Sequence, residues 1–555
     1  MAVFASLLLI LATAADPQTV VVSADRVYTM DPDRSVVEAL AYGKDGKLLA
    51  VGRRETLLER YPDAARRDYA GQTIVPGLID AHAHLLGLGL ALLRADLVGA
   101  ESRKEVLDRL RAFDRSLPEG AWLLGRGWDQ NDWPDRSFPT REDLDRSFPN
   151  RPIWLIRIDG HAGWANSAAL AAADRDLTGD WQPEGGRIMR DEDGRPTGIF
   201  IDRAMGLIQR AVPEPDSEIL REALRRALEK AATVGLTGVH DMTVSYGQFA
   251  LYREYYREHQ PTLRVYAYSD GDARFLDELC RHGPVEEPFL TARGVKFYVD
   301  GALGSRGAAL HEDYADDPGN RGLLIQPRGA LAELIDRAMG CGLQVATHAI
   351  GDRGNSIVLD LYEELSGDHP ENPGRHRIEH AQVVVVDELS RFAEEQVIAS
   401  VQPTHATSDM YWAEDRVGPE RIRGAYAWRS LIEEGARLAL GSDFPVERPD
   451  PLLGLYAAVT RQDLEGWPAG GWYASEGLSR EEALAGFTRD AAYAAFAEDE
   501  VGSLEPGKRA DFVVLGGDLM TVPASEIPRL PIIATYVDGR AVYENKAVAT
   551  GKGAK

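Results

Sequence analysis

The sequence has few cysteines and no excess of positive charge. Cysteine occurs only twice in 555 residues, at Cys280 and Cys341, which is too few for a disulfide framework. We expect both to be buried or idle thiols. Acidic residues outnumber basic ones by 88 to 62, and the net charge is −26. This balance disfavours nucleic acid and anionic lipid as partners and leaves a small-molecule substrate as the expected one.

Apolar runs long enough to span a bilayer are also absent from the sequence. The N-terminus, MAVFASLLLILATAADPQ, has a short apolar core followed by the A-x-A cleavage pattern Ala12-Thr13-Ala14, although no Lys or Arg precedes the core. We expect residues 1–15 to be a cleaved secretory signal and the mature protein to be exported, without a stable membrane anchor. A cytoplasmic location is the alternative.

The two ends of the chain share a strand-like pattern. Residues 16–73 contain TVVVSADRVYTM and GKLLAVG, and residues 496–548 contain ADFVVLGGD and IIATYVDGRAVYEN. Alternating apolar residues separated by turn residues indicate short strands and hairpins. We expect the two ends to combine into one small composite β-sandwich domain.

The section between them, residues 74–495, alternates β-branched apolar runs with amphipathic stretches of helical period. The eight runs are TIVPGLIDAHAH, VGLTGVHDM, TLRVYAYSD, RGVKFYVDG, LQVATHAIGD, RIEHAQVV, VIASVQPTHA and ARLALGSDFP. Eight strands alternating with helices predict an α/β fold of the (β/α)8 TIM-barrel type. A Trp- and Asp-rich interval of about residues 100–230 follows the first run, and we expect this large insertion to cap the barrel mouth.

Side chains that can bind a metal fall at the C-terminal ends of these runs. His82 and His84 lie one residue apart in GLIDAHAHL and therefore point to the same side of a strand. His348, His380 and Asp443 end the fifth, sixth and eighth runs, in THAIGD, RIEHAQ and LGSDFP. Because the C-terminal ends of barrel strands meet at one rim, all five side chains are predicted to converge on a metal site.

The fourth run carries a lysine, Lys296, within the apolar segment VKFYVDG. A lysine inside a strand is costly to bury unless it is paired or neutral. Burial beside cations lowers its pKa and frees the amine for carbamylation, which produces a carboxylate able to bridge two metal ions. An ion pair with a carboxylate is the alternative reading of this lysine.

Several motifs together resemble the amidohydrolase superfamily, and most closely its branch of YtcJ-like metal-dependent hydrolases, which includes N-substituted formamide deformylases. The motifs span almost the whole chain and are PGLIDAHAHL, GRGWDQNDWP, DGHAGWANSAAL, VKFYVDGALGSRGAAL, THAIGDRGN, RIEHAQ, LGSDFPVE and GSLEPGKRADFVVL. The resemblance implies two divalent metal ions, usually zinc. His82, His84 and Asp443 would hold one ion, and His348 and His380 the other. Carbamylated Lys296 and a hydroxide would bridge them.

The expected reaction is hydrolysis of a C–N amide bond in a small N-acyl or N-formyl substrate. Asp443 would take the proton of the attacking water and pass it to the departing nitrogen. A lactonase or phosphotriesterase is the enzymatic alternative, because the same nucleophile attacks an ester carbon or phosphorus. The non-enzymatic alternative is a barrel that binds metal but does not catalyse a reaction. Oligomeric state is not readable from the sequence, and a homodimer is only the common default.

Further residues are candidates for the substrate pocket or for positioning the ligands. The candidates for substrate contact are Arg306 and Asp300 after the fourth run, His405 at the end of the seventh run, and His161 and Trp128 in the insertion, with Asp129 and Trp164 beside them. The candidates for positioning the metal ligands are Glu379 and Asp352. His240 and Asp241, at the end of the second run, are expected to be structural.

Overall fold

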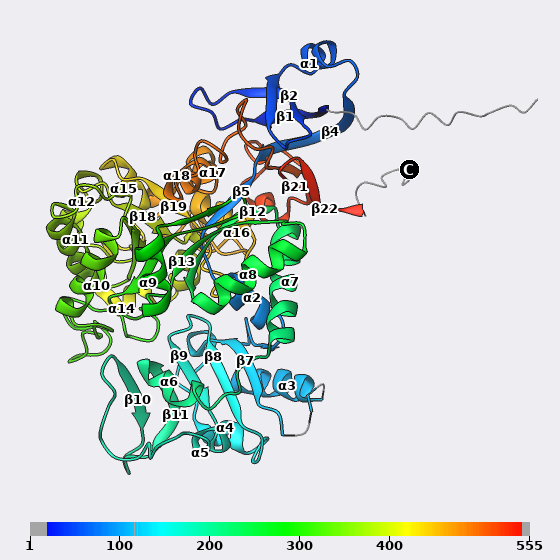
Figure 1. Cartoon of the computed structure of the whole chain (residues 1–555). Coiled ribbons are helices and arrows are strands. Elements are labelled where there is room, and N and C mark those ends of the chain that lie inside the picture. Colours follow the sequence, from blue (N-terminus) through cyan, green and yellow to red (C-terminus); the bar gives the residue numbers. More distant parts are fainter. Residues whose placement is uncertain (1–18, 116, 119, 547–555) are drawn as a thin grey trace, which may run out of the picture.

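The computed structural model describes residues 19–115, 117–118 and 120–546. The predicted signal segment, residues 1–15, lies outside the described residues. Three sheets organise the chain, as Figure 1 shows: a barrel in the middle, a small sheet built from both chain ends, and a sheet formed by the insertion. Among the described residues, no helix is long and apolar enough to cross a membrane.

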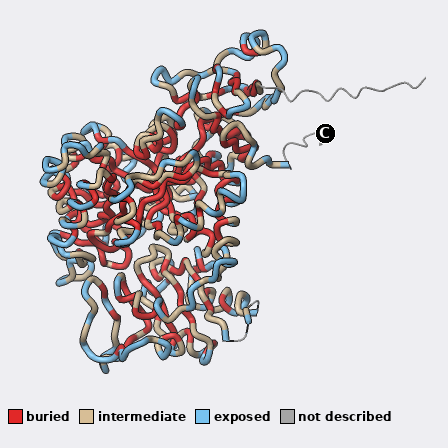
Figure 2. The backbone as a smooth tube through the Cα atoms, in the orientation of Figure 1, coloured by how far each residue is buried: buried red, intermediate tan, exposed pale blue. Residues whose placement is uncertain are grey.

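The barrel sheet contains the eight predicted runs as parallel strands in chain order. They are β5 (Leu78–Ala83), β12 (Leu236–Val244), β13 (Arg264–Ser269), β15 (Leu290–Tyr298), β16 (Gln344–Ala349), β17 (Arg377–His380), β18 (Ile398–Val401) and β19 (Leu438–Leu440), and the short β14 (Val285–Glu287) pairs antiparallel with β15. Strands such as β5 and β16 are buried at every position, because helices cover the outside and side chains fill the inside. Buried residues accordingly concentrate along these strands in Figure 2. The predicted (β/α)8 barrel is confirmed.

The barrel closes where its first and last strands meet. Ala83 forms a parallel bridge with Phe444, the amide of Asp443 donates to the carbonyl of His82 at 2.7 Å, and the amide of His84 donates to the carbonyl of Phe444 at 2.8 Å. Gly441 permits this approach, because a Cβ there would lie 2.5 Å from the amide nitrogen of His82. Closure therefore places His82, His84 and Asp443 beside one another through backbone bonds.

The small sheet joins the two ends of the chain. Its strand order is β22-β21-β20-β4-β1-β2-β3, and β4 pairs antiparallel with β20. The strands are β1 (Thr19–Tyr28), β2 (Val36–Gly43), β3 (Leu48–Gly52), β4 (Ala65–Pro76), β20 (Phe512–Leu515), β21 (Ile532–Val537) and β22 (Arg540–Glu544). Gly77 leads the chain from β4 into barrel strand β5, and a Cβ at Gly77 would lie 2.2 Å from the hydroxyl oxygen of Thr237. The small sheet is thus anchored directly to the start of the barrel.

The insertion folds into its own six-stranded sheet, ordered β10-β11-β9-β8-β7-β6. Its strands are β6 (Ala95–Asp96), β7 (Leu123–Trp128), β8 (Ile153–Arg157), β9 (Ala162–Ala165), β10 (Gly186–Arg190) and β11 (Pro196–Asp202). A separate apolar core, which includes Trp128, Trp133 and Trp164, fills one face of this sheet. The chain returns to the barrel through helix α7 (Ser217–Thr233). Asp216 caps the N-terminus of this helix, since its side chain accepts a hydrogen bond from the amide of Ile219.

The remaining helices are mostly short. The first packs on the small sheet, those between β6 and α7 pack in the insertion, and most of the others lie around the barrel (Figure 1). Those before β15 are α1 (Arg54–Arg60), α2 (Leu85–Ala91), α3 (Arg103–Asp114), α4 (Arg141–Asp145), α5 (Ser167–Ala171), α6 (Gly206–Gln209), α8 (Tyr246–Glu258) and α9 (Ala273–His282). Those after it are α10 (Arg328–Gly340), α11 (Asp352–Ser366), α12 (Arg391–Glu394), α13 (Pro403–Asp409), α14 (Ala413–Arg421), α15 (Trp428–Glu433), α16 (Pro451–Thr460), α17 (Arg480–Gly486) and α18 (Arg489–Ala494).

The two cysteines form a disulfide, so the expectation of idle thiols is wrong. Cys280 lies in the last turn of α9, Cys341 follows α10, and their Cα atoms are 4.9 Å apart. This pairing was not predictable from the sequence, because the two cysteines are 61 residues apart and meet only when neighbouring barrel helices pack. The disulfide therefore joins two consecutive helices on the outside of the barrel.

We expect the Cys280→Ser/Cys341→Ser double variant to be less stable by about 2–4 kcal/mol, because a cross-link over a long loop restricts the unfolded chain. Urea unfolding of the variant and the wild type, each with and without reductant, measures the difference. Reductant should destabilise the wild type only. Two free thiols per chain in the unreduced, denatured wild type would contradict the pairing.

Candidate metal centre

The predicted ligands meet at the C-terminal rim of the barrel. One nitrogen or oxygen atom from each of His82, His380 and Asp443 lies within 4.8 Å of the other two, and all three residues are buried. His84 joins them, since its Nε2 lies 3.1 Å from Oδ1 of Asp443. The ring centroid of His348 lies 4.5 Å from that of His380. All five side chains predicted from the strand ends are therefore gathered at one place.

Hydrogen bonds at the far ring nitrogens leave a lone pair on each histidine. Nδ1 of His82 lies 2.5 Å from Oε2 of Glu379, Nδ1 of His380 lies 2.7 Å from Oε1 of Gln402, and Nδ1 of His84 lies 3.2 Å from the carbonyl of Met242. Each oxygen accepts from Nδ1–H, so Nε2 keeps its lone pair. Such partners are typical of metal-binding histidines because they fix the tautomer and the ring orientation.

His348 is held the opposite way round. Its Nε2 lies 3.4 Å from the carbonyl of Gly301 and 3.6 Å from Oδ1 of Asp300. Nδ1 of His348 is therefore the nitrogen left free to bind. Burial lowers the pKa of His348 and His380 well below the usual value, and burial together with Lys296 lowers the pKa of His82 to about 4. These imidazoles are neutral at pH 7, as metal binding requires.

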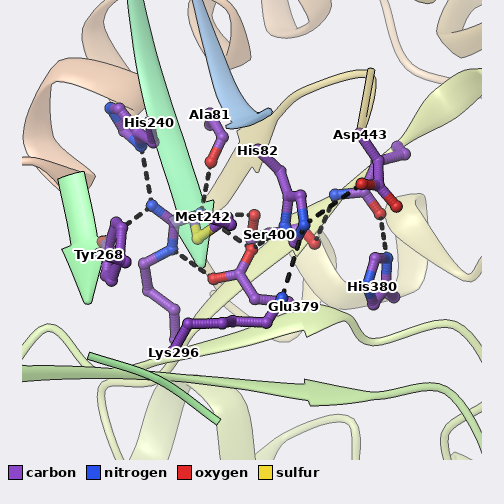
Figure 3. A network of polar contacts seen from close by, with 12 residues as sticks. Ala81, His82, His240, Met242, Tyr268, Lys296, Glu379, His380, Ser400 and Asp443 are labelled. Atoms are coloured by element: carbon purple, nitrogen blue, oxygen red, sulfur yellow. Dashed lines mark hydrogen bonds and ion pairs between the residues drawn. The ribbon is translucent and has the colours of Figure 1, made fainter. Parts of the chain in front are cut away.

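Lys296 reaches the same group of ligands from β15. Its side chain is buried, and Nζ lies 3.5 Å from Nε2 of His82 (Figure 3). Burial lowers the pKa of Lys296 to about 8, so a substantial neutral fraction exists near neutral pH. No carboxylate in the described part of the chain lies within ion-pair distance of Nζ. The alternative interpretation, in which Lys296 forms a simple ion pair, therefore has no direct contact to support it.

Asp443 is the acidic member of the cluster. Burial would raise the pKa of its carboxyl group, but the surrounding imidazoles, His82 first, hold it well below the usual value. Its Oδ1 is buried and receives no well-aligned hydrogen bond, although Nε2 of His82 lies only 3.5 Å away. An ionised, buried oxygen that faces imidazole lone pairs is unfavourable unless a cation lies between them. The donor set therefore fits divalent metal.

A buried ion pair lies directly beneath these ligands. Arg377 and Glu379 are both fully buried, and Nε of Arg377 lies 2.8 Å from Oε1 of Glu379. Arg377 also donates to the carbonyl of Ala81 at 2.6 Å and to Nδ1 of His240 at 2.8 Å. The other partners of Arg377 are the hydroxyl groups of Tyr268 and Ser400. One guanidinium thus connects five barrel strands and orients Glu379 toward His82.

The backbone is strained at two ligands. His380 has φ of 76° and Asp443 has φ of 57°, in the left-handed region that side chains other than glycine rarely adopt. In a regular strand, Glu379 and His380 would point to opposite faces. Because the chain leaves strand geometry at His380, Glu379 can bind the ring of His82 while the ring of His380 lies 4.9 Å from that of His82. Such strain is common at functional sites.

A cavity of about 1020 Å³ opens above the ligands, between the barrel rim and the insertion. Of the residues predicted to contact substrate, His161, His405 and Asp129 line it. Nε2 of His405 lies 3.9 Å from Oδ2 of Asp443, and His405 belongs to the first turn of α13 rather than to the end of β18. Burial would lower the pKa of His161, but the hydrogen bond from its Nδ1 to Asp202 raises it to about 8.

Four predicted substrate residues do not line this cavity. Trp128 is fully buried in the insertion core, where its Nε1 donates to the carbonyl of Leu155, and Trp164 packs against it. Arg306 pairs with Asp316 at 2.9 Å. Asp300 instead accepts from three backbone amides, those of Ala309, Ile350 and Gly351, and so shapes the loop after His348.

The positioning partners also differ in part from the prediction. Glu379 contacts His82 as expected, whereas Asp352 accepts from the amide of His311 and contacts no ligand by a hydrogen bond. Gln402 and Asp202 were missed, although Gln402 directly follows β18, which is one of the predicted runs. Asp202 ends β11 in the insertion, where no strand was predicted. Arg126 and Arg157 in the insertion also line the cavity and were missed, because nothing in their local sequence shows that β7 and β8 face the barrel.

Comparisons with known proteins agree with this geometry. Residues 67–543 match the family model described as the amidohydrolase family. The chain is 35% identical to the YtcJ protein of Bacillus subtilis, over 93% of this chain and 98% of YtcJ. It is 30% identical to N-substituted formamide deformylase of Arthrobacter pascens, over 93% and 97% of the two chains. The crystal structure of an uncharacterized metal-dependent hydrolase from Pyrococcus horikoshii covers 91% of this chain and 99% of its own, with 30% identity and a TM-score of 0.73. The chain belongs to the amidohydrolase family and is a metal-dependent hydrolase.

Proposed function

We propose that this enzyme hydrolyses the C–N bond of a small N-acyl or N-formyl amine at a site that holds two divalent metal ions, with zinc as the first choice. The observation that carries the proposal is the convergence of His82, His84, His348, His380 and Asp443 around Lys296 at the bottom of one cavity. The likeness to an N-substituted formamide deformylase supports the reaction class. When bound, the metal ions would lower the pKa of water and polarise a carbonyl group.

The ligands divide between two ions in this proposal. His82, His84 and Asp443 would hold one ion, and His348 and His380 the other, with carbamylated Lys296 between them. The buried position of Lys296 beside His82 and its lowered pKa support carbamylation, because only the neutral amine reacts with carbon dioxide. The close group formed by His82, His380 and Asp443 draws residues from both sets, which favours two ions close together.

The other side chains of the site would act on the substrate and its protons. Asp443 would accept a proton from the attacking water and deliver it to the leaving nitrogen, since amines leave poorly unless they are protonated. His405, whose Nε2 is buried and has no hydrogen-bond partner in the described part of the chain, faces the same space and would bind a substrate oxygen. His161, held by Asp202, would close the opposite wall.

Export is part of the same proposal. A disulfide between Cys280 and Cys341 is typical of proteins that mature in an oxidising compartment. Together with the A-x-A pattern near the N-terminus, it supports a periplasmic or secreted enzyme.

Metal content tests the proposal first. We expect two transition-metal ions per chain by mass spectrometry of the purified mature protein supplied with metal and bicarbonate. The loaded enzyme should release formate from N-formyl amines and lose this activity on chelation. One ion or none, without formate release, would contradict the binuclear deacylase, and hydrolysis of lactones or phosphotriesters instead would change the substrate class.

We expect Asp443→Asn to lower kcat by about 10²–10⁴-fold while metal remains largely bound, because the amide cannot accept the proton. Stopped assays and metal analysis of the same sample measure both quantities. The matched control is Asp463→Asn, which changes another carboxylate that lines the cavity but forms no ion pair with a candidate ligand among the described residues, and it should leave kcat within about threefold. Near-normal turnover in Asp443→Asn would remove Asp443 from the mechanism.

We expect Lys296→Ala to lose metal and activity, and short carboxylic acids to restore part of both by taking the place of the carbamate. Metal content and turnover at increasing acetate or propionate concentration measure the rescue. Full metal occupancy in Lys296→Ala, with no response to acid, would show that Lys296 is not a ligand.

A further inference from the structure

Two arginines in the cavity lack the carboxylate partners that neutralise the other buried arginines of the site. Arg94 and Arg126 both line the cavity. Among the described residues, neither guanidinium lies within ion-pair distance of a carboxylate, and the side chain of Arg94 makes no hydrogen bond. Arg157, in the same wall, is by contrast held by Asp129 at 2.5 Å and by Asp159 at 2.6 Å. The positive charge of Arg157 is therefore balanced, and that of the other two arginines is not.

Arg126 is fixed in place by backbone atoms. Its Nη2 donates to the carbonyl of Ile158 at 2.8 Å and its Nε to the carbonyl of Pro445 at 3.3 Å. Pro445 lies two residues after Asp443, so this guanidinium is tied to the edge of the metal centre. Nη1 of Arg126 has no partner among the described residues. A guanidinium held rigidly by two carbonyl groups, with a donor left over, is prepared to bind an anion.

The surface between the metal ligands and Arg94 is apolar. Helix α2 begins one residue after His84, and Leu86, Gly87, Leu90 and Ala91 line the cavity along it. Helix α2 covers about 10 Å at about 1.5 Å per residue, and Arg94 follows its last residue by three positions. The cavity wall thus presents an apolar strip beside the metal ligands, with Arg94 beyond the strip and Arg126 at the edge of the metal centre.

For both arginines, the loss of solvent around the positive charge is not outweighed by any attraction of nearby carboxylates. Loss of solvent lowers the pKa of Arg94, and it lowers the pKa of Arg126 to about 10 even though Asp443 and Asp159 act in the opposite direction. The chain as a whole carries a net charge of −26, so this basic region is exceptional. Unpaired cations in an apolar wall are costly to the free enzyme and are relieved when an anion binds.

We propose that Arg94 and Arg126 bind a carboxylate on the amine portion of the substrate, so that the preferred substrate is an N-acylated amine with an apolar chain ending in a carboxylate. The planar guanidinium fork matches a carboxylate, and two arginines can share its two oxygens. The anionic group belongs to the amine portion because the proposed acyl group is small. This inference rests on the proposed deacylase function and specifies its substrate class.

The test compares two substrates that differ only in the terminal group. N-formyl-6-aminohexanoate carries the carboxylate, and N-formylhexylamine has the same chain without it. For the metal-loaded wild type we expect kcat/KM to be at least tenfold higher for the carboxylate. Arg94→Met and Arg126→Met should each lower kcat/KM for the carboxylate by about 10- to 100-fold, mainly through KM. Arg94→Met should change kcat/KM for the neutral substrate by less than about threefold, because Arg94 holds no other group in place.

Two further variants separate a specific site from a general field. Arg448→Met removes an exposed arginine at the edge of the same cavity and should change neither substrate by more than about threefold. Arg126→Lys should recover part of the lost preference, since charge is kept and the fork is not. Arg94→Met removes no hydrogen bond of the described chain, so its thermal unfolding should match the wild type. An equal loss in Arg448→Met would overturn the proposal in favour of long-range attraction.

The outcomes also distinguish this inference from the proposed function. Equal hydrolysis of both substrates, unaffected by the arginine variants, would leave the deacylase standing and reject the carboxylate site. If neither substrate is hydrolysed, the deacylase proposal fails, and calorimetric titration with hexanoate and hexanamide still decides the anion site. Preferential binding of hexanoate that is weakened in Arg94→Met would support the site, and binding that is unchanged in that variant would overturn it.

Discussion

The buried ion pair between Arg377 and Glu379 is the constraint on which the metal centre depends. Both groups are fully buried, and removing one partner of such a pair costs about 3–5 kcal/mol because the other charge stays buried alone. The same two residues also position the site. Oε2 of Glu379 fixes the ring of His82, and Arg377 donates to the backbone carbonyl of Ala81, the residue before His82 in β5. The ligand and its strand are thus oriented by the same two charges.

Closure of the barrel adds a second constraint, which acts on the other side of His82. Backbone hydrogen bonds between the end of β5 and the segment after β19 set Asp443 beside His82, and Asp80 strengthens the junction by accepting from the amide and hydroxyl of Ser442. The backbone at Asp443 and His380 is in the left-handed region, and the surrounding hydrogen bonds stabilise this strained conformation. Rigid placement of ligands is what a metal site needs to keep their lone pairs converging.

Chemistry and recognition come from different parts of the chain. Every candidate metal ligand stands on a barrel strand or directly after one, whereas the insertion contributes His161, Arg126 and Arg157 to the cavity wall. A barrel with a fixed centre and a separate sheet facing it can change substrate by altering the insertion alone. The unpaired arginines of the cavity fit this division, because they lie outside the barrel strands.

The sequence by itself determined the barrel, its eight strands and the side chains that gather at the candidate metal centre, because strand periodicity and the position of polar residues at strand ends are local properties. It also identified Glu379 as a partner, through its place beside His380. Only the tertiary structure decided in which direction the side chains of Glu379 and His380 point. Strand alternation alone would have separated Glu379 from His380, and the φ of 76° at His380 brings both inside. Trp128 and Arg306 looked like pocket residues, yet their environments are an apolar core and an ion pair. The disulfide and the cavity arginines depend on which helices and sheets pack together, and such contacts between segments far apart in the chain leave no periodic signal in the sequence.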